Sequence, residues 1–315
     1  MTDWSHTAFL FPGQGSQAVG MGQELSDAFA ESRAVFQQAD AILGFELSAL
    51  CFSGPEDDLN QTVNTQPAVF TTGIATLRAL QALQPDAQPA MAAGHSFGEI
   101  TALVAADALT FEDGLKLARE RGRVMKEAGE RSPGAMAALL GLDIDAVREL
   151  CAQAQGQTGG VLVVANDNCP GQVVISGDSQ TLDAGLELAT TMGARRAVKL
   201  AVSIAAHSPL MQAAADEFRE ILAATPFETP RIPVYGNLSA APLTSPDAIR
   251  AELGNQLTDG VRWTESIQHM ITAGTDRFVE LGSKDVLTGL LKRIDRNVRG
   301  TPINSLAALQ ALMME

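Results

Sequence analysis

The sequence predicts a layered α/β fold: a large domain with a mostly parallel sheet, into which a small α+β subdomain is inserted. Along most of the chain, short apolar runs typical of buried strands alternate with segments of helical periodicity. Between residues 133 and 199 the order becomes strand, helix, strand, strand, helix, strand, which is the split ferredoxin-like unit. A chain of 315 residues, 46% of them hydrophobic, can bury a core of this size. We therefore assign residues 1–132 and 200–315 to the large domain and residues 133–199 to the insert.

The large domain begins with an apolar run at residues 7–11, which predicts a buried strand that enters a tight loop at Pro12 and Gly13. Apolar residues at helical spacing then predict three helices, at residues 66–83, 97–109 and 111–128. The last of these begins with two acidic residues, which are favourable at a helix N-terminus. The sheet is expected to resume near residues 234–235 and 277–279.

Six segments of the insert follow from the same patterns. We predict strands at residues 135–140, 161–164, 172–176 and 196–200, and helices at residues 144–154 and 179–192.

Composition excludes several classes of protein. A net charge of −15 and a pI of about 4.7 argue against nucleic-acid binding, which needs a basic surface. No apolar run approaches the roughly 20 residues that cross a bilayer, and the start at residues 1–4 lacks the basic segment of a signal peptide, so we expect a cytoplasmic protein. Cys51, Cys151 and Cys169 are widely spaced, which predicts reduced thiols rather than disulfides or a zinc site.

The sequence Gly-His-Ser-Phe-Gly at residues 94–98 matches the Gly-x-Ser-x-Gly nucleophile elbow of α/β-hydrolase-like domains. It follows a strand of small residues and precedes a predicted helix, so the hydroxyl of Ser96 should be exposed on a strained turn. The backbone N–H of Phe97 should point in the same direction. Ser96 is therefore the candidate nucleophile.

A serine nucleophile needs a base, usually histidine, and the chain has four histidines. His6 is near a terminus, and His269 belongs to a helical pattern, so a surface or core position is favoured for both. His95 neighbours Ser96, but adjacent side chains on a tight turn diverge, which favours a buried supporting role. His207 lies in a loop that leaves a strand and ends at a proline, and it is the best candidate base.

Six motifs occur in an order that is typical of one family. They are Phe-Pro-Gly-Gln-Gly-Ser-Gln at 11–17, Thr-Gln-Pro-Ala at 65–68, Gly-His-Ser-Phe-Gly-Glu at 94–99, Arg-Gly at 121–122, Pro-Gly-Gln-Val-Val-Ile-Ser-Gly at 170–177 and His-Ser-Pro-Leu-Met at 207–211. From about residue 8 to residue 308 the chain resembles malonyl-CoA:acyl carrier protein transacylases of fatty acid synthesis and the related discrete polyketide acyltransferases. The resemblance implies a ping-pong transfer of malonyl from coenzyme A to the serine and then to the phosphopantetheine thiol of acyl carrier protein.

The resemblance also implies roles for single residues. Ser96 would attack the thioester while His207 takes its proton, and the backbone N–H groups of Gln14 and Phe97 would hold the oxyanion. Arg121 would bind the free carboxylate of malonate, which suits a planar guanidinium. Taken alone, Arg121 shares a helix with two further arginines, and most helical arginines are solvated.

Four more residues are assigned to the substrate site. By resemblance, a backbone carbonyl at Gln256 orients the histidine, and Asn166 and Asn168 line the pantetheine channel, with His95 beside them. No metal and no bound cofactor is implied, because the coenzyme A thioester is a substrate.

Two departures from the family pattern bear on the acyl group. Phe97 stands where leucine is common, and its ring is expected to narrow the acyl pocket. Ala205 and Ala206 stand where relatives often carry larger side chains, which leaves room for an acyl group larger than malonyl. Arg121 still indicates that this group carries a carboxylate.

Other classes of function stay open at this point. The same serine and histidine would serve a polyketide acyltransferase with another acyl choice, or a serine hydrolase of acyl thioesters. Residues 13–18 also match a loose dinucleotide-binding pattern, but Pro12, Gly20 and Gly22 disfavour the helix that such a site requires. A non-catalytic interaction module is disfavoured by the intact set of Ser96, His207 and Arg121.

The expected partner, acyl carrier protein, is strongly acidic, so docking on this acidic chain requires a local basic surface. One candidate is Arg195 and Arg196 together with Lys199. The other lies between residues 292 and 299 and carries four cations. We select Arg195 and Arg196 as the docking residues, and we expect a monomer.

Overall fold

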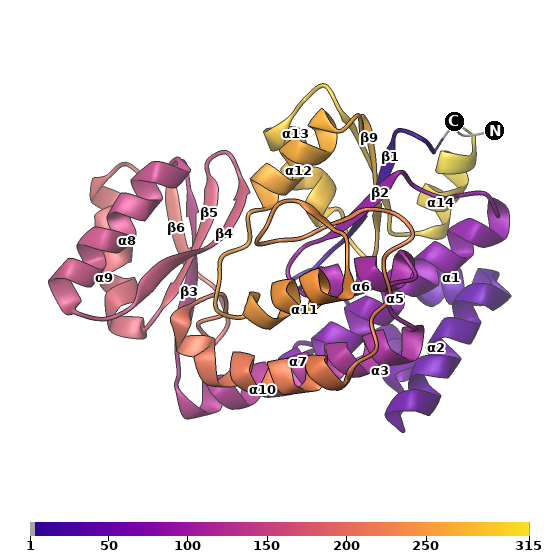
Figure 1. The fold of residues 1–315 in the computed structure, drawn as a ribbon, viewed down its shortest axis with the longest axis horizontal. Helices are drawn as coiled ribbons and strands as arrows, with labels where there is room; N and C mark the ends of the chain where they lie inside the picture. The colour runs from indigo at the N-terminus through magenta and orange to yellow at the C-terminus, as the bar shows by residue number, and fades with distance from the viewer. Residues whose placement is uncertain (1–3, 315) are drawn as a thin grey trace.

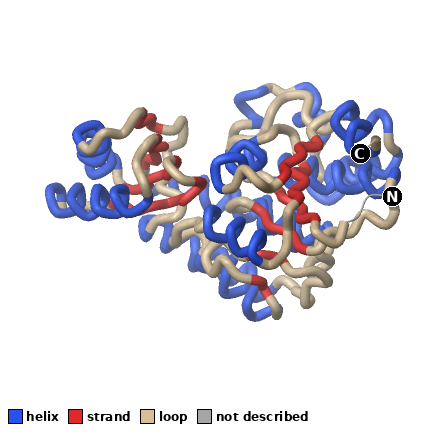
Figure 2. The backbone as a smooth tube through the Cα atoms, turned by 90° about the horizontal axis from the view of Figure 1, so that it is seen from above, coloured by secondary structure: helices blue, strands red, loops and turns tan. Residues whose placement is uncertain are grey.

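The computed structural model describes residues 4–314, and its strands form two separate sheets (Figures 1 and 2). The large sheet has six strands in the order β10-β9-β1-β2-β7-β8. Their bounds are β1 Thr7–Phe11, β2 Met91–Gly94, β7 Val234–Tyr235, β8 Pro242–Leu243, β9 Arg277–Leu281 and β10 Arg299–Ile303. All neighbouring pairs are parallel except β7 with β8. The predicted α/β class with a mostly parallel sheet is confirmed.

Strand β1 lies in the middle of this sheet, between β9 and β2. All five of its residues are buried, as expected for a parallel strand that is covered by helices on both faces. The chain leaves β1 at Pro12 and leaves β2 at Gly94, so both loops emerge at the same end of the sheet. Ligand sites of parallel sheets form at this carboxyl end of the strands.

Helices surround the large sheet. They are α1 Gln23–Ala28, α2 Ala30–Leu43, α3 Leu47–Ser53, α4 Glu56–Leu59, α5 Thr62–Leu83, α6 Gly98–Ala105, α7 Phe111–Arg131, the 3₁₀ turn Pro209–Met211, α10 Gln212–Ala224, α11 Pro246–Asn255, α12 Trp263–Thr272, α13 Val286–Ile294 and α14 Leu306–Met313.

Helix α5 begins four residues before its predicted start, and it therefore contains Pro67. Proline has no N–H, so the carbonyl of Val63, one turn earlier, loses its helical partner. Arg119 of α7 supplies a replacement, because its Nη1 donates to the Val63 carbonyl at 2.8 Å. A neighbouring helix thus compensates for the proline that suggested a later start.

Helix α6 is shorter than predicted and ends at Ala105 rather than at residue 109. Asp107 has φ of 56°, a left-handed conformation that no α-helix continues through. Helix α7 then begins at Phe111, where the hydroxyl of Thr110 accepts the N–H of Asp113. It extends to Arg131, three residues beyond the prediction.

The second sheet is antiparallel, with four strands in the order β4-β5-β3-β6. Its elements are β3 Ala135–Leu140, α8 Ile144–Thr158, β4 Leu162–Cys169, β5 Gln172–Gly177, α9 Ser179–Thr191 and β6 Arg196–Lys199. The predicted order of strands and helices is confirmed. The division of the whole chain into residues 1–132 with 200–315 and residues 133–199 stays a prediction.

Alternation along the strands gives the small sheet two different faces. Ala137, Leu139 and Ile175 pack with α8 and α9 in a separate hydrophobic cluster. Figure 1 shows these helices on the side that points away from the large sheet. The intervening residues Met136 and Ala138 line a cavity shared with the large sheet's loops. The insert therefore contributes one wall of that cavity.

Strand β4 is longer than the predicted strand at residues 161–164 because its end also contacts the larger part of the molecule. Val261 exchanges backbone hydrogen bonds with β4, donating to Ala165 at 2.8 Å and accepting from Asp167 at 2.9 Å. Register shifts interrupt the β4–β5 pairing beyond Val164. These irregularities turn the end of β4 toward the cavity, where Asn166 and Asn168 lie.

Three chemical features of the fold bear on the earlier expectations. The three cysteines are buried and free, as predicted, and burial raises the pKa of Cys51 and of Cys151 to about 12. Over residues 4–314, no helix has the length and apolar character that spanning a bilayer requires. Those residues also contain no group of three or more His, Cys, Asp or Glu side chains arranged to hold a metal ion.

Candidate active site

Ser96 lies on the turn between β2 and α6, and its φ of 52° is left-handed. Such a conformation is strained for serine, and the flanking glycines explain how the chain accommodates it. A Cβ atom on Gly94 would collide with the backbone of Gly98, and one on Gly98 would collide with the Phe11 carbonyl. Only glycine at both positions allows the turn to pack this tightly on itself and against the end of β1.

His207 faces Ser96 across the cavity, with 2.9 Å between its Nε2 and the serine Oγ. Its Nδ1 lies 2.7 Å from the carbonyl oxygen of Gln256 and 3.2 Å from that of Asp259. Since carbonyls only accept hydrogen bonds, Nδ1 must carry the proton. Nε2 is then the unprotonated nitrogen and accepts the Ser96 hydroxyl proton.

The His207 imidazole is held in its neutral form. Burial and the nearby cation of Arg121 lower its pKa to about 3, although the Gln256 carbonyl opposes this effect. A neutral imidazole hydrogen-bonded to a serine hydroxyl is the geometry that general-base activation requires.

Arg121 projects from α7 to the same place, with only 1% of its surface exposed. Its Nη2 lies 3.2 Å from Ser96 Oγ and 2.9 Å from Gln256 Oε1, while its Nε has no partner. Burial lowers the pKa of Arg121 to about 10, so the group stays charged near neutral pH. Among residues 4–314, no carboxylate forms an ion pair with it. A buried guanidinium without an anion is unfavourable by itself, and it creates a site for an anionic ligand.

A cavity of about 310 Å³ joins these groups. Eight of the predicted site residues line it: Gln14, His95, Ser96, Phe97, Arg121, Asn166, Asn168 and His207. Gln256 lies behind the cavity, where its carbonyl holds His207 and its amide contacts Arg121. Arg195 and Arg196 are exposed and lie outside the lining.

Two backbone N–H groups at the cavity are free to bind an oxyanion. Neither Gln14 nor Phe97 donates its N–H to an acceptor within the part of the chain that the structure describes. Phe97 also stands at the N-terminus of α6, where the helix dipole favours negative charge. The N–H of Ser96 itself is occupied, because it donates to Asn237 Oδ1 at 2.7 Å.

His95 connects the elbow to the small sheet. Its Nε2 lies 2.8 Å from Asn168 Oδ1 on β4, and its ring packs edge-on against Trp263 of α12. Burial lowers the pKa of His95, which favours a neutral ring. His95 is half-buried rather than buried, and its contact with Asn168 holds that residue at the cavity wall.

Comparisons with known proteins agree over nearly the whole chain. Residues 8–309 match the model of the acyl transferase domain family. The malonyl CoA-acyl carrier protein transacylase of Bacillus subtilis is 42% identical over 295 residues, which cover 94% of this chain and 92% of that protein. The chain belongs to the malonyl-CoA:acyl carrier protein transacylase family. It is therefore an acyltransferase.

Solved structures of this transacylase family have the same fold. An acyl carrier protein S-malonyltransferase from Vibrio cholerae superposes with a TM-score of 0.94 at 42% identity, covering 98% of this chain and all of that one. A malonyl-transacylase in complex with a type II polyketide synthase acyl carrier protein superposes with a TM-score of 0.95 at 37% identity, covering 98% and 99% of the two chains.

Two further residues of this transacylase support the elbow without having been predicted from the sequence: Asn237, which contacts it directly, and Glu99, which contacts Asn237. Asn237 accepts the Ser96 N–H and donates to the Gly94 carbonyl at 2.7 Å. Glu99 is fully buried in α6 and accepts from Asn237 and Gln256. A glutamate in an otherwise apolar helix was the available signal, but its partners are distant in sequence.

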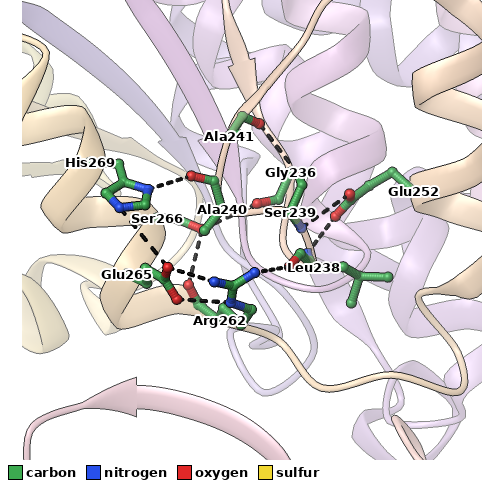
Figure 3. A network of polar contacts seen from close by, with 10 residues as sticks. All are labelled: Gly236, Leu238, Ser239, Ala240, Ala241, Glu252, Arg262, Glu265, Ser266 and His269. Carbon is green, nitrogen blue, oxygen red and sulfur yellow. Dashed lines mark hydrogen bonds and ion pairs between the residues drawn. The ribbon is translucent and has the colours of Figure 1, made fainter.

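The loop that carries Asn237 is fixed on both sides (Figure 3). The Glu252 carboxylate of α11 accepts from the backbone N–H groups of Leu238 and Ser239. Arg262, the N-cap residue of α12, donates from Nη1 to the Leu238 carbonyl at 2.7 Å, and Nδ1 of His269 in α12 lies 2.7 Å from the Ala240 carbonyl. Contacts from α11 and from α12 with its N-cap residue thus hold residues 236–241 beside the elbow.

The two departures from the family pattern lie at different depths. The Phe97 ring is fully buried in the main core, and the residue lines the cavity. Ala206 also lines the cavity. Ala205 instead packs against Gly134: a Cβ atom added to Gly134 would lie only 2.5 Å from the Cβ atom of Ala205. Of the two alanines, Ala206 is the one that leaves space at the cavity.

Proposed function

We propose that this acyltransferase moves a malonyl group from malonyl-CoA to the phosphopantetheine thiol of acyl carrier protein, through a ping-pong mechanism with an acyl-enzyme on Ser96. The observation that carries the proposal is the convergence of a serine–histidine pair and an unpaired, buried arginine in one cavity. The names of the relatives support the same donor and acceptor.

In the first half-reaction, Ser96 Oγ attacks the thioester carbonyl while His207 Nε2 takes the hydroxyl proton. The tetrahedral intermediate collapses, the C–S bond breaks, and the imidazolium returns its proton to the leaving coenzyme A thiolate. In the second half-reaction, the carrier thiol attacks the acyl-serine and His207 again transfers the proton. The Gln256 carbonyl keeps Nδ1 protonated, so Nε2 always faces the reacting atoms.

The negative charge that develops on the carbonyl oxygen requires donors that are already in place. The free N–H groups of Gln14 and Phe97 fit this need because neither is used elsewhere within residues 4–314. Removal of one such donor typically raises the barrier by roughly 2.7–4 kcal/mol.

Arg121 selects an acyl group that carries a carboxylate. The malonyl carboxylate would supply the anion that the buried guanidinium lacks, and the Nε and Nη atoms offer a two-pronged match to it. The space beside Ala206 is compatible with a longer dicarboxylic acyl group. Asn166, Asn168 and His95 would line the pantetheine channel at the wall formed by the small sheet.

Acyl carrier protein would dock at the cavity mouth on the side of Arg195 and Arg196. Two exposed apolar residues line the cavity: Leu200, which follows β6, at 37% exposure, and Val286, the first residue of α13, at 41% exposure. Apolar lining residues at the cavity, together with exposed arginines at the start of β6, suit an acidic protein that inserts a thiol-bearing arm. We propose a cytoplasmic, monomeric enzyme. The reaction has no redox step and needs no resident cofactor, since coenzyme A is a substrate.

A mass measurement tests the proposed function. After incubation with malonyl-CoA, the intact enzyme should gain one malonyl group on Ser96, and S96A should gain none. Loading from methylmalonyl-CoA tests whether the cavity accepts a larger acyl group. Loading from acetyl-CoA tests whether the enzyme requires a free carboxylate on the acyl group. In R121L, malonyl loading should fall by about 10²-fold because the charge-assisted hydrogen bonds are lost, while acetyl loading should fall much less.

The same experiment separates a transferase from a thioester hydrolase. Holo acyl carrier protein added to the loaded enzyme should remove the malonyl group and become malonylated. Release of free malonate at a comparable rate before the carrier is added would refute the proposal, because a transferase must exclude water from its acyl-serine.

A further inference from the structure

A buried carboxyl group lies directly behind the nucleophile elbow and touches none of the reacting atoms. Glu99 is in the first turn of α6, has no exposed surface, and forms no ion pair within residues 4–314. A buried carboxyl group that forms no direct ion pair is unfavourable unless hydrogen bonds replace its lost hydration. Its partners therefore indicate what it does.

All of the hydrogen bonds to Glu99 converge on one oxygen. Oε2 accepts the backbone N–H of Asn237 at 2.9 Å, the side-chain amide of Asn237, and Nε2 of Gln256 at 3.1 Å. The other oxygen, Oε1, has no partner. Glu99 thus acts as a single acceptor shared by two side-chain amides.

These two amides hold the Ser96 backbone from both sides. Asn237 Oδ1 accepts the Ser96 N–H at 2.7 Å, and Gln256 Nε2 donates to the Ser96 carbonyl at 3.1 Å. Gln256 also contacts the other two groups of the site, through its carbonyl to His207 and through Oε1 to Arg121.

An amide group can rotate by 180° and exchange its oxygen with its NH₂, so something must fix its direction. Asn237 directs its NH₂ toward two acceptors, Gly94 O and Glu99, which leaves its oxygen for the Ser96 N–H. Gln256 directs its NH₂ toward Ser96 O and Glu99, which leaves its oxygen for Arg121. Glu99 is the acceptor common to both orientations.

We propose that Glu99 is a positioning residue: by accepting from Asn237 and Gln256, it fixes the two amides that hold Ser96 in its strained conformation and aim Arg121 at the cavity. The use of Ser96 in malonyl transfer rests on the proposed function. The effect of Glu99 on the geometry and reactivity of Ser96 can be measured independently of it. The charged or titratable groups around the cluster are Glu252 on α11, Arg121 on α7 and His207 in the loop after β6.

The test measures the rate at which phenylmethanesulfonyl fluoride labels Ser96. This probe reacts with an activated serine, and it carries no carboxylate for Arg121 to bind. Glu99→Gln keeps one oxygen that can accept from the Asn237 N–H, the Asn237 side-chain amide and Gln256 Nε2. Its NH₂ group takes the place of Oε1, which has no partner. Glu99→Leu removes every acceptor. We expect the labelling rate to fall by about 10²-fold in E99L and to stay within about tenfold of wild type in E99Q.

Ile100→Val is the matched control, since Ile100 is the next residue of α6, is fully buried in the core and does not line the cavity. I100V should lower the unfolding midpoint without changing the labelling rate. A folded E99L that is labelled at the wild-type rate overturns the proposal, and so does an E99Q as slow as E99L.

A second variant decides the question even if E99L does not fold. Asn237→Asp keeps the acceptor for Ser96 N–H but turns an oxygen toward Glu99 and the Gly94 carbonyl. Labelling of N237D should therefore be slow at pH 8 and should recover as the pH falls, because a protonated Asp regains a donor. A wild-type rate with a wild-type pH dependence contradicts the proposal. Failure of wild-type enzyme to form malonyl-Ser96 would instead sink the proposed function and leave this comparison intact.

Discussion

At the scale of single residues, the site is defined by two buried basic groups whose ionisation states are opposite. Arg121 stays protonated although it is buried, whereas His207 is kept neutral by burial and by that same cation. The two effects are linked, because a cation beside an imidazole disfavours the imidazolium. The arginine therefore has two consequences, an attraction for a carboxylate and the maintenance of a free base on His207.

This linkage predicts the pH dependence of Ser96 reactivity. Since the pKa of His207 is lowered to about 3, labelling by a neutral sulfonyl fluoride should show no acid limb near pH 6.5 and should persist as the pH falls toward that lower value. Removal of the cation in R121L raises the pKa of His207, so the limb should move to higher pH. A wild-type limb at pH 6.5, or one that does not move in R121L, would contradict this reasoning.

At the scale of elements, helix α7 is the support that brings Arg121 to the elbow. It begins at a capping pair, in which Thr110 Oγ1 accepts the Asp113 N–H at 3.1 Å and donates to its carboxylate at 2.6 Å. It packs along α5, where Arg119 satisfies the carbonyl left free by Pro67. A well-anchored α7 keeps the guanidinium fixed relative to β2 and α6.

We expect Thr110→Ala to lower the free energy of unfolding by about 1 kcal/mol, because the first turn of α7 loses its cap. Urea denaturation would measure this loss, and Thr110→Ser should restore most of it. Malonyl loading at temperatures well below unfolding should be unchanged, since the cap is eleven residues before Arg121. An equal loss in the alanine and serine variants would show that the hydroxyl is not the stabilising group.

At the scale of the whole molecule, the cavity exists because two sheets from different parts of the chain face each other. Two contacts connect the parts of the chain that carry the two sheets. Val261 exchanges backbone hydrogen bonds with β4. Arg293 of α13 donates to the Gln172 side chain at 2.8 Å and to the Pro170 carbonyl at 3.0 Å. Arg293 belongs to the second basic stretch noted in the sequence, so one of its four cations has a structural partner. Lys199, beside Arg196, is likewise paired with Asp183.

Charge reversal tests the proposed carrier surface. The double variant R195E/R196E should raise the apparent KM for acyl carrier protein by about tenfold and reduce its dependence on salt, while loading from malonyl-CoA stays unchanged. R33E/R78E is the matched control, because it changes the net charge equally at exposed positions of α2 and α5. Equal effects from both double variants would indicate a general charge effect rather than docking.

Much of the fold follows from local patterns, and the deviations occur where a segment distant in sequence compensates for a local signal or extends an element. The order of strands and helices in the insert was predictable because each segment shows its own periodicity. The start of α5 was misplaced because Pro67 normally marks a helix start, and the partner that compensates for it lies more than fifty residues away. The end of β4 was missed because its pairing continues through register shifts and contacts Val261.

The sequence by itself identified the elbow, because Gly94, Ser96 and Gly98 form the Gly-x-Ser-x-Gly pattern that is typical of that turn. It also singled out His207 from four histidines by its loop. The resemblance implied that the Gln256 carbonyl orients the imidazole. Only the tertiary structure decided that Arg121 is buried without an ion pair and that the Asn237 and Gln256 side chains hold the backbone of Ser96. Burial and hydrogen bonding depend on which distant segments pack together, and no single stretch of sequence contains that information.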